Sequence, residues 1–253
     1  PVYQPQRARD EEFIEELKKI NPDVIVVVAY GQILPESILN IPKYGCINVH
    51  GSLLPKYRGA APIQWAVLDG EEKTGITTMY MEKGLDTGDM IDKAEVVLDE
   101  KETAGSLHDK LMVLGADLLL ETLKKLEDGT AVRKKQNDEE SCYAKMLSKD
   151  MGQIDFTKDA KEIECLIRGM NPWPSAYTSL DGKTMKVWEA DVLDRESKEE
   201  PGTIVEVTKK EIIVATGSND LALHEIQLAG KKRMQVQAFL LGYQVEAGMK
   251  LGE

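Results

Sequence analysis

The stretch INVHGSLLPKYRG, residues 47–59, decides how this chain is organised. Its apolar start is typical of the end of a buried strand, where Asn48 and His50 stand two residues apart. Because side chains alternate along a strand, these two project from the same face. In open α/β sheets, ligands bind outside the carboxyl ends of the strands. The stretch therefore predicts a site where a reactive carbonyl meets a polar donor and an acid.

A second loop supplies a carboxylate. In GLDTGD, residues 84–89, the carboxylate of Asp86 lies between two glycines. Taken alone, Asn48 and His50 are also compatible with ordinary strand-end groups that cap a loop. The second loop favours a functional site, with Asn48, His50 and Asp86 as the candidate catalytic residues.

These motifs resemble the folate-dependent formyltransferase family. The resemblance rests on Asn48-x-His50, the turn Ser52-Leu53-Leu54-Pro55 and the later Leu85-Asp86-Thr87-Gly88. The stretch YRGAAPIQW, residues 57–65, resembles the sequences of one branch of this family. In that branch, the formyl group is accepted by the methionine carried by initiator tRNA. The similarity extends over essentially the whole chain.

Composition limits the alternatives. The chain has 253 residues, 42% of them hydrophobic and 30% charged, which is typical of a globular protein of one large or two ordinary domains. Its net charge of -12 does not suggest nucleic-acid binding, so any RNA contact needs local basic patches. The three cysteines are scattered, which predicts free thiols in a reducing compartment and no zinc site. With no signal peptide or membrane-spanning run visible, we expect a cytoplasmic protein, and we expect a monomer.

The first part of the chain has the pattern of an α/β domain. Residues 10–20 predict a helix capped by Asp10, and the apolar run 24–28 predicts a parallel strand buried on both faces. The family's fold has strands before this point, so we expect the chain to lack roughly the first sixty residues of the family pattern. Strands are expected at 76–81 and 91–98, and helices at 37–39, 61–68 and 103–126.

The second part has a different pattern. We place an incomplete Rossmann-like formyltransferase domain at 1–129, a solvated linker at 130–149 and an OB-like β-barrel domain at 150–253. The barrel is expected to hold a helix at 160–170 and short strands at 176–179, 184–190, 202–207, 211–216 and 221–226.

The resemblance implies 10-formyltetrahydrofolate as formyl donor, methionine on initiator tRNA as acceptor, and no metal. The family's folate contacts fall here on Ser52, Leu53, Leu54 and Pro55, and on the loop residues Gln32, Ile33 and Leu34, largely through backbone groups. We expect basic residues to contact the RNA, and for each of them a merely solvated position is the alternative. These residues are Arg58, Arg133, Lys134, Lys135, Lys231, Lys232 and Arg233.

The chemistry assigns a role to each candidate. Attack of an amine on the formyl carbonyl creates an oxyanion, which Asn48 and His50 would stabilise as donors. Asp86 would orient His50 or a water for proton transfer, and a nearby carboxylate is expected to favour the charged imidazolium. Three alternatives share some of these features: a formyltransferase for an amino sugar nucleotide, a 10-formyltetrahydrofolate hydrolase and a non-catalytic RNA-binding fragment.

Overall fold

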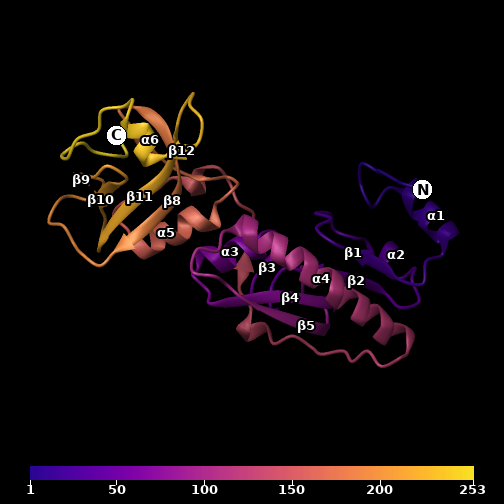
Figure 1. Cartoon of the computed structure of the whole chain (residues 1–253). Coiled ribbons are helices and arrows are strands. Elements are labelled where there is room, and N and C mark those ends of the chain that lie inside the picture. The colour runs from indigo at the N-terminus through magenta and orange to yellow at the C-terminus, as the bar shows by residue number, and fades with distance from the viewer. The chain divides into compact units, whose positions relative to one another are not determined.

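A computed structural model describes all residues, 1–253 (Figure 1). Contacts divide the chain into two compact units, each described here by itself. The first unit comprises residues 1–63, 73–98 and 108–146, and the second comprises residues 64–72, 99–107 and 147–253. The segment expected to be a linker is thus shared between the two units and lies mostly in the first.

The first unit is built on a four-stranded sheet in the order β1-β2-β4-β5. Only β1 and β2 run parallel, and the other neighbours are antiparallel. The helices and strands that contribute to this unit are α1 (Glu11–Ile20), β1 (Ile25–Val27), α2 (Glu36–Leu39), β2 (Cys46–His50), β3 (Arg58–Gly59), α3 (Pro62–Leu68), β4 (Lys73–Tyr80), β5 (Met90–Val97), α4 (Ala104–Glu127), the 3-10 turn Asp138–Glu140 and β6 (Tyr143–Ala144).

The expectation of a first strand buried on both faces is wrong. Ile25 and Val27 pack in one cluster with residues of α1 and α2. On the opposite face, Val26 is 37% exposed and Val28 is 59% exposed. The physical reason is that α1 and α2 cover only the face that carries Ile25 and Val27, while the face of Val26 and Val28 stays open.

The segment 130–149 is also more ordered than a solvated linker. Its strand β6 pairs in parallel with β3, and the backbone of Lys134 forms a bridge with Met90. Gln136 is buried, with 5% of its surface exposed. The segment has little apolar periodicity because hydrogen bonds, rather than an apolar stripe, hold it in place.

The second unit contains a six-stranded antiparallel sheet. Its order is β7-β8-β11-β10-β9, with β12 paired to β11, and β8 and β11 run side by side along most of their length (Figure 1). Its elements are the 3-10 turn Asp150–Gly152, α5 (Ala160–Gly169), β7 (Ala176–Leu180), β8 (Lys183–Leu193), β9 (Ile204–Val207), β10 (Ile212–Ala215), β11 (Asp220–Leu228), β12 (Met234–Gln235) and α6 (Val236–Leu240).

The end of the chain connects the two outer strands of this sheet. The N–H of Ile204 in β9 donates to the carbonyl of Met249 at 2.8 Å, and Gly252 N–H donates to Ser179 of β7 at 3.1 Å. These bonds complete a barrel-like circuit. Ile163 and Ile167 of α5 pack into its apolar core.

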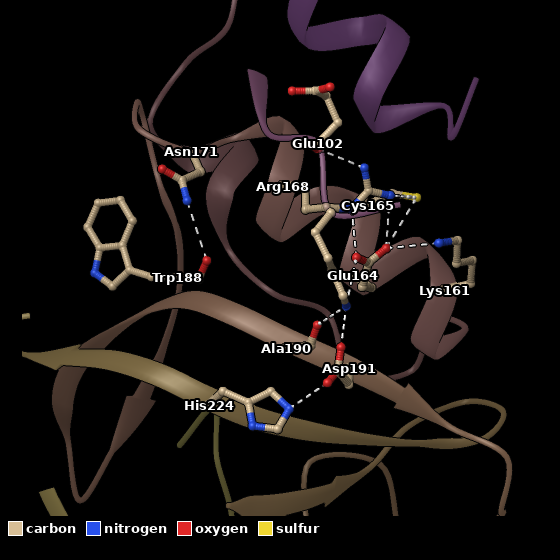
Figure 2. A network of polar contacts seen from close by, with 11 residues as sticks. Glu102, Lys161, Glu164, Cys165, Arg168, Asn171, Trp188, Ala190, Asp191 and His224 are labelled. Carbon is tan, nitrogen blue, oxygen red and sulfur yellow. Dashed lines mark hydrogen bonds and ion pairs between the residues drawn. The ribbon is translucent and has the colours of Figure 1, made fainter. Parts of the chain in front are cut away.

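An ion pair in α5 ties the segment 99–107 to this unit (Figure 2). Arg168 donates to both carboxylate oxygens of Glu164, at 2.6 and 2.9 Å, and to the carbonyl of Glu102 at 2.9 Å. Lys101 contacts Asp191 of β8, which also meets His224 of β11 at 2.9 Å. Burial opposes ionisation of Glu164, but the hydrogen bonds from Arg168 and Lys161 outweigh it and lower the pKa of Glu164.

Candidate active site

The predicted catalytic residues converge at the end of β2. A Cβ on Gly115 of α4 would lie 3.2 Å from Val49, so Val49 faces α4. By strand alternation, Asn48 and His50 face the opposite side of the sheet. There, Asn48 Nδ2 lies 3.5 Å from Asp86 Oδ1, and His50 Nδ1 lies 3.8 Å from Asp86 Oδ2. The structure thus brings all three side chains together.

His50 is buried and has two distinct ring nitrogens. Nε2 lies 2.9 Å from the carbonyl oxygen of Tyr57, which can only accept, so Nε2 carries the proton. Nδ1 faces Asp86 at a distance too long for a hydrogen bond. Burial lowers the pKa of His50, and this effect exceeds the opposing effects of Asp86 and the Tyr57 carbonyl.

The expectation of a charged imidazolium is therefore wrong. A carboxylate nearby does favour the charged form. His50 is only 5% exposed, however, and the loss of hydration disfavours the charged form more strongly than Asp86 favours it. At neutral pH the ring is neutral, with a free lone pair on Nδ1. Such a nitrogen is equipped to accept a proton beside a carboxylate that can stabilise the product.

The carboxylate of Asp86 is held by the backbone of the neighbouring loop. Its Oδ2 accepts the N–H of Gly59 at 2.8 Å, and its side chain is 12% exposed. Asp86 itself adopts a left-handed backbone, with φ of 51°. A Cβ on Gly88 would lie 1.8 Å from the carbonyl oxygen of Tyr80, so this loop needs glycine to approach β4.

The turn expected to contact folate is packed into the protein. Ser52 and Leu54 are fully buried; Ser52 donates to the carbonyl of Lys56, and Leu54 packs with Met79 and Met90. Pro55 is buried as well, whereas Leu53 is half-buried. The side chains of Ser52 and Leu54 are thus inaccessible to a folate. Only the backbone of this turn and the side chain of Leu53 remain available for such a contact.

The loop after β1 lies at the same edge of the sheet, because β1 and β2 are parallel and their carboxyl ends coincide. Ile33 is 83% exposed and Leu34 is in the core. The amide oxygen of Gln32 accepts the N–H of Ala8 at 2.8 Å, so this side chain braces the segment before α1.

The basic residues of the first unit have different surroundings. Arg58 was expected to contact phosphate, but its side chain is only 12% exposed and pairs with Gln136 and Asp138 at 2.9 and 2.8 Å. Arg133 lies over the ring of Tyr80, 3.8 Å from its centre. Lys134 and Lys135 are exposed.

In the second unit, Lys231, Lys232 and Arg233 lie in the exposed turn before β12. Arg233 pairs with Glu225 and lies over Trp188, 4.6 Å from the ring centre. We call Trp188, Lys231, Lys232 and Arg233 the basic barrel surface. It combines positive charge with an aromatic ring on a protein that is acidic overall.

Sequence reasoning missed three groups at the site: the Tyr57 carbonyl, the Gly59 N–H and Gln136. The first two are backbone groups, which no residue pattern reveals. Gln136 lies in a polar segment without periodicity and contacts Asp86 only after the chain has folded. The signal available was its position between the basic and acidic runs of that segment, which is too weak to predict a contact.

Comparison with known proteins identifies the class. Residues 1–123 match the profile of the family described as formyl transferase, and residues 146–244 match that of the formyl transferase C-terminal domain. The chain therefore belongs to the formyl transferase family.

Within this family, the chain is similar to methionyl-tRNA formyltransferases. It is 60% identical to that of Clostridioides difficile strain 630 over 252 residues, covering 100% of this chain and 82% of the relative. It is 52% identical to that of Geobacter metallireducens, covering 100% of this chain and 80% of the relative.

Two solved structures share the fold. HypX from Aquifex aeolicus, in complex with tetrahydrofolic acid, has a TM-score of 0.67 at 16% identity, covering 93% of this chain and 44% of HypX. The sugar 3N-formyl transferase WlaRD has a TM-score of 0.66 at 20% identity, covering 85% of this chain and 77% of WlaRD. None of the helices combines the length and the hydropathy that a membrane-spanning segment needs.

Proposed function

We propose that the protein transfers a formyl group from 10-formyltetrahydrofolate to the amino group of methionine on initiator tRNA. The observation that carries this proposal is the convergence of Asn48, His50 and Asp86 at one strand end. The acceptor is supported by relatives of that name at 52–60% identity over the whole chain. Such a reaction belongs in the cytoplasm, where initiator tRNA is charged.

The geometry divides the work between the two strand-end residues. Because the Nε2–H of His50 already donates to the Tyr57 carbonyl, we assign stabilisation of the developing oxyanion to Asn48. The Nδ2 of Asn48 makes only a long contact with Asp86, so it retains capacity to donate to a substrate oxygen.

His50 then serves as the proton carrier. As the amine attacks, its nitrogen gains positive charge and must lose a proton, which the free Nδ1 of His50 accepts. The imidazolium formed has a new Nδ1–H directed at Asp86, which stabilises the charge. His50 returns the proton to the folate nitrogen as its bond to the formyl carbon breaks, so no proton is gained or lost overall.

Exposed groups on each unit support the two proposed substrates. The 10-formyltetrahydrofolate donor supplies the activated formyl group, and the exposed Ile33 and the backbone of residues 52–55 offer it contacts at the carboxyl edge of β1 and β2. For the RNA, the exposed Lys231 and Lys232 of the second unit offer contacts to phosphates, and so, separately, do Arg133, Lys134 and Lys135 of the first unit.

A comparison of acceptors tests the proposal. The full-length protein is given 10-formyltetrahydrofolate with either charged initiator tRNA or an amino sugar nucleotide. We expect a much larger kcat/KM for the tRNA. A larger value for the sugar nucleotide would contradict the assigned acceptor, and release of free formate with neither acceptor formylated would indicate a hydrolase.

A further inference from the structure

Gln136 forms a hydrogen-bonded clamp on the loop that carries Asp86. Its Nε2 donates to the carbonyl of Asp86 at 2.7 Å and to the carbonyl of Gly88 at 2.8 Å. Its Oε1 accepts from Nε of Arg58 at 2.9 Å. Both amide protons are used, and the side chain is buried, so its position is well determined.

The same segment holds the other partner of His50. The Tyr57 N–H meets Sγ of Cys142 at 3.2 Å, and the Arg58 N–H donates to the Cys142 carbonyl at 2.9 Å. Tyr57 is the residue whose carbonyl accepts from His50 Nε2. Gln136 and Cys142 therefore anchor the loops on both sides of the imidazole ring.

We propose that Gln136 is a positioning residue for formyl transfer, which fixes the Asp86 carboxylate at the distance where it stabilises the protonated form of His50. This inference rests on the function proposed above. Gln136 touches no reacting atom. It acts through the backbone on either side of Thr87, in a loop whose tip is open to solvent, with Leu85 54% exposed.

Removing the clamp has a defined electrostatic consequence. Asp86 raises the pKa of His50, and burial lowers it by a larger amount. If the loop relaxes and Asp86 moves away, the pKa of His50 falls and the imidazolium that forms during the reaction is less stable. A misplacement of about 1 Å at a catalytic group can cost about 10²-fold in rate, so we expect a loss of about 10- to 100-fold in kcat.

The variant Gln136→Met keeps the side chain's length but removes the amide. Asn137→Ala is the matched control, because Asn137 caps the adjacent 3-10 turn and bonds only within residues 137–140. We expect Gln136→Met to lower kcat with little change in KM for tRNA, and Asn137→Ala to leave both unchanged. Gln136→Asn, whose amide is one methylene short of the loop, replaces Gln136→Met if the latter does not fold.

Two readouts separate positioning from a purely structural role. In an NMR titration, the pKa of His50 should fall in Gln136→Met relative to wild type and control. In an Asp86→Asn background, Gln136→Met should cause no further loss of kcat, because the two act through one interaction.

An unchanged pKa of His50, or the full loss of kcat on top of Asp86→Asn, would overturn the inference. If the wild-type protein transfers no formyl group, the proposed function fails. The titration alone then decides whether Gln136 positions Asp86.

Discussion

Substituting Arg168 by Met should destabilise the second unit strongly. Arg168 makes two hydrogen bonds to Glu164 and one to the Glu102 carbonyl, and Glu164 is only 2% exposed by its side chain. Removing one partner of a buried ion pair typically costs about 3–5 kcal/mol, because the remaining charge is left without compensation. Lys161 still lies 3.0 Å from Glu164, so we expect the lower end of this range, about 3 kcal/mol.

Urea unfolding measures this cost. The three tryptophans, Trp65, Trp173 and Trp188, all lie in the second unit, so their fluorescence reports its unfolding. Lys158→Ala is the matched control, two residues before the start of the same helix. Its partner Glu162 is 3.9 Å away and both side chains are more than half exposed, so it should cost less than about 1 kcal/mol.

A second variant checks the mechanism of this loss. Glu164→Gln combined with Arg168→Met removes the uncompensated charge and should recover part of the stability. The loss in Arg168→Met should also shrink toward acid pH. Glu164 has a lowered pKa in the folded protein, so its stabilising contribution is present above the ordinary pKa of 4.5 and is lost as pH falls through the folded value. A cost equal to that of Lys158→Ala would refute the reasoning.

The remaining predictions concern the site and the RNA contacts. Asn48→Ala should lower kcat by about 10²–10³-fold with little effect on unfolding, as expected for an oxyanion donor, and a near-normal kcat would remove that role. The wild-type protein should lose stability as the pH falls below 6.5, the ordinary pKa of His, because the unfolded chain then binds a proton that buried His50 does not. His50→Asn should show a shallower dependence of Tm on pH, and equal slopes would count against a neutral His50. Reversing the charge of Lys231 and Lys232 should weaken tRNA binding and reduce its salt slope by about one for each phosphate that the protein no longer neutralises, whereas reversal of the exposed Lys209 and Lys210 should not; equal effects would indicate a solvated turn.

Much of the architecture could be predicted from local patterns. The alternation of Asn48 and His50 placed both on one face, and the glycines around Asp86 marked a loop that approaches them. The strands of the second unit followed from short apolar runs between turns, and five of them lie where they were expected. Such features depend on residues close together in the sequence.

The errors concern properties that depend on distant residues. The charge state of His50 depends mainly on how far the folded protein shields the ring from water. The sequence shows the carboxylate, 36 positions later, but it does not show the burial. The sequence around Arg58 is compatible with an exposed cation. In the folded protein its guanidinium donates hydrogen bonds to Gln136 and Asp138, about 80 residues later. The role of the segment 136–144 arises in the same way, since its partners belong to other loops.

The most direct test of the account is the rate of formyl transfer to methionyl initiator tRNA by His50→Asn, measured in single turnovers with saturating donor. His50 is assigned the transfer of a proton from the amine to the leaving nitrogen, and general acid–base catalysis of this kind contributes about 10²–10⁴-fold. We predict a loss of that size, with the fold intact by circular dichroism. A rate within about threefold of wild type would contradict the central claim that the neutral imidazole beside Asp86 carries the proton.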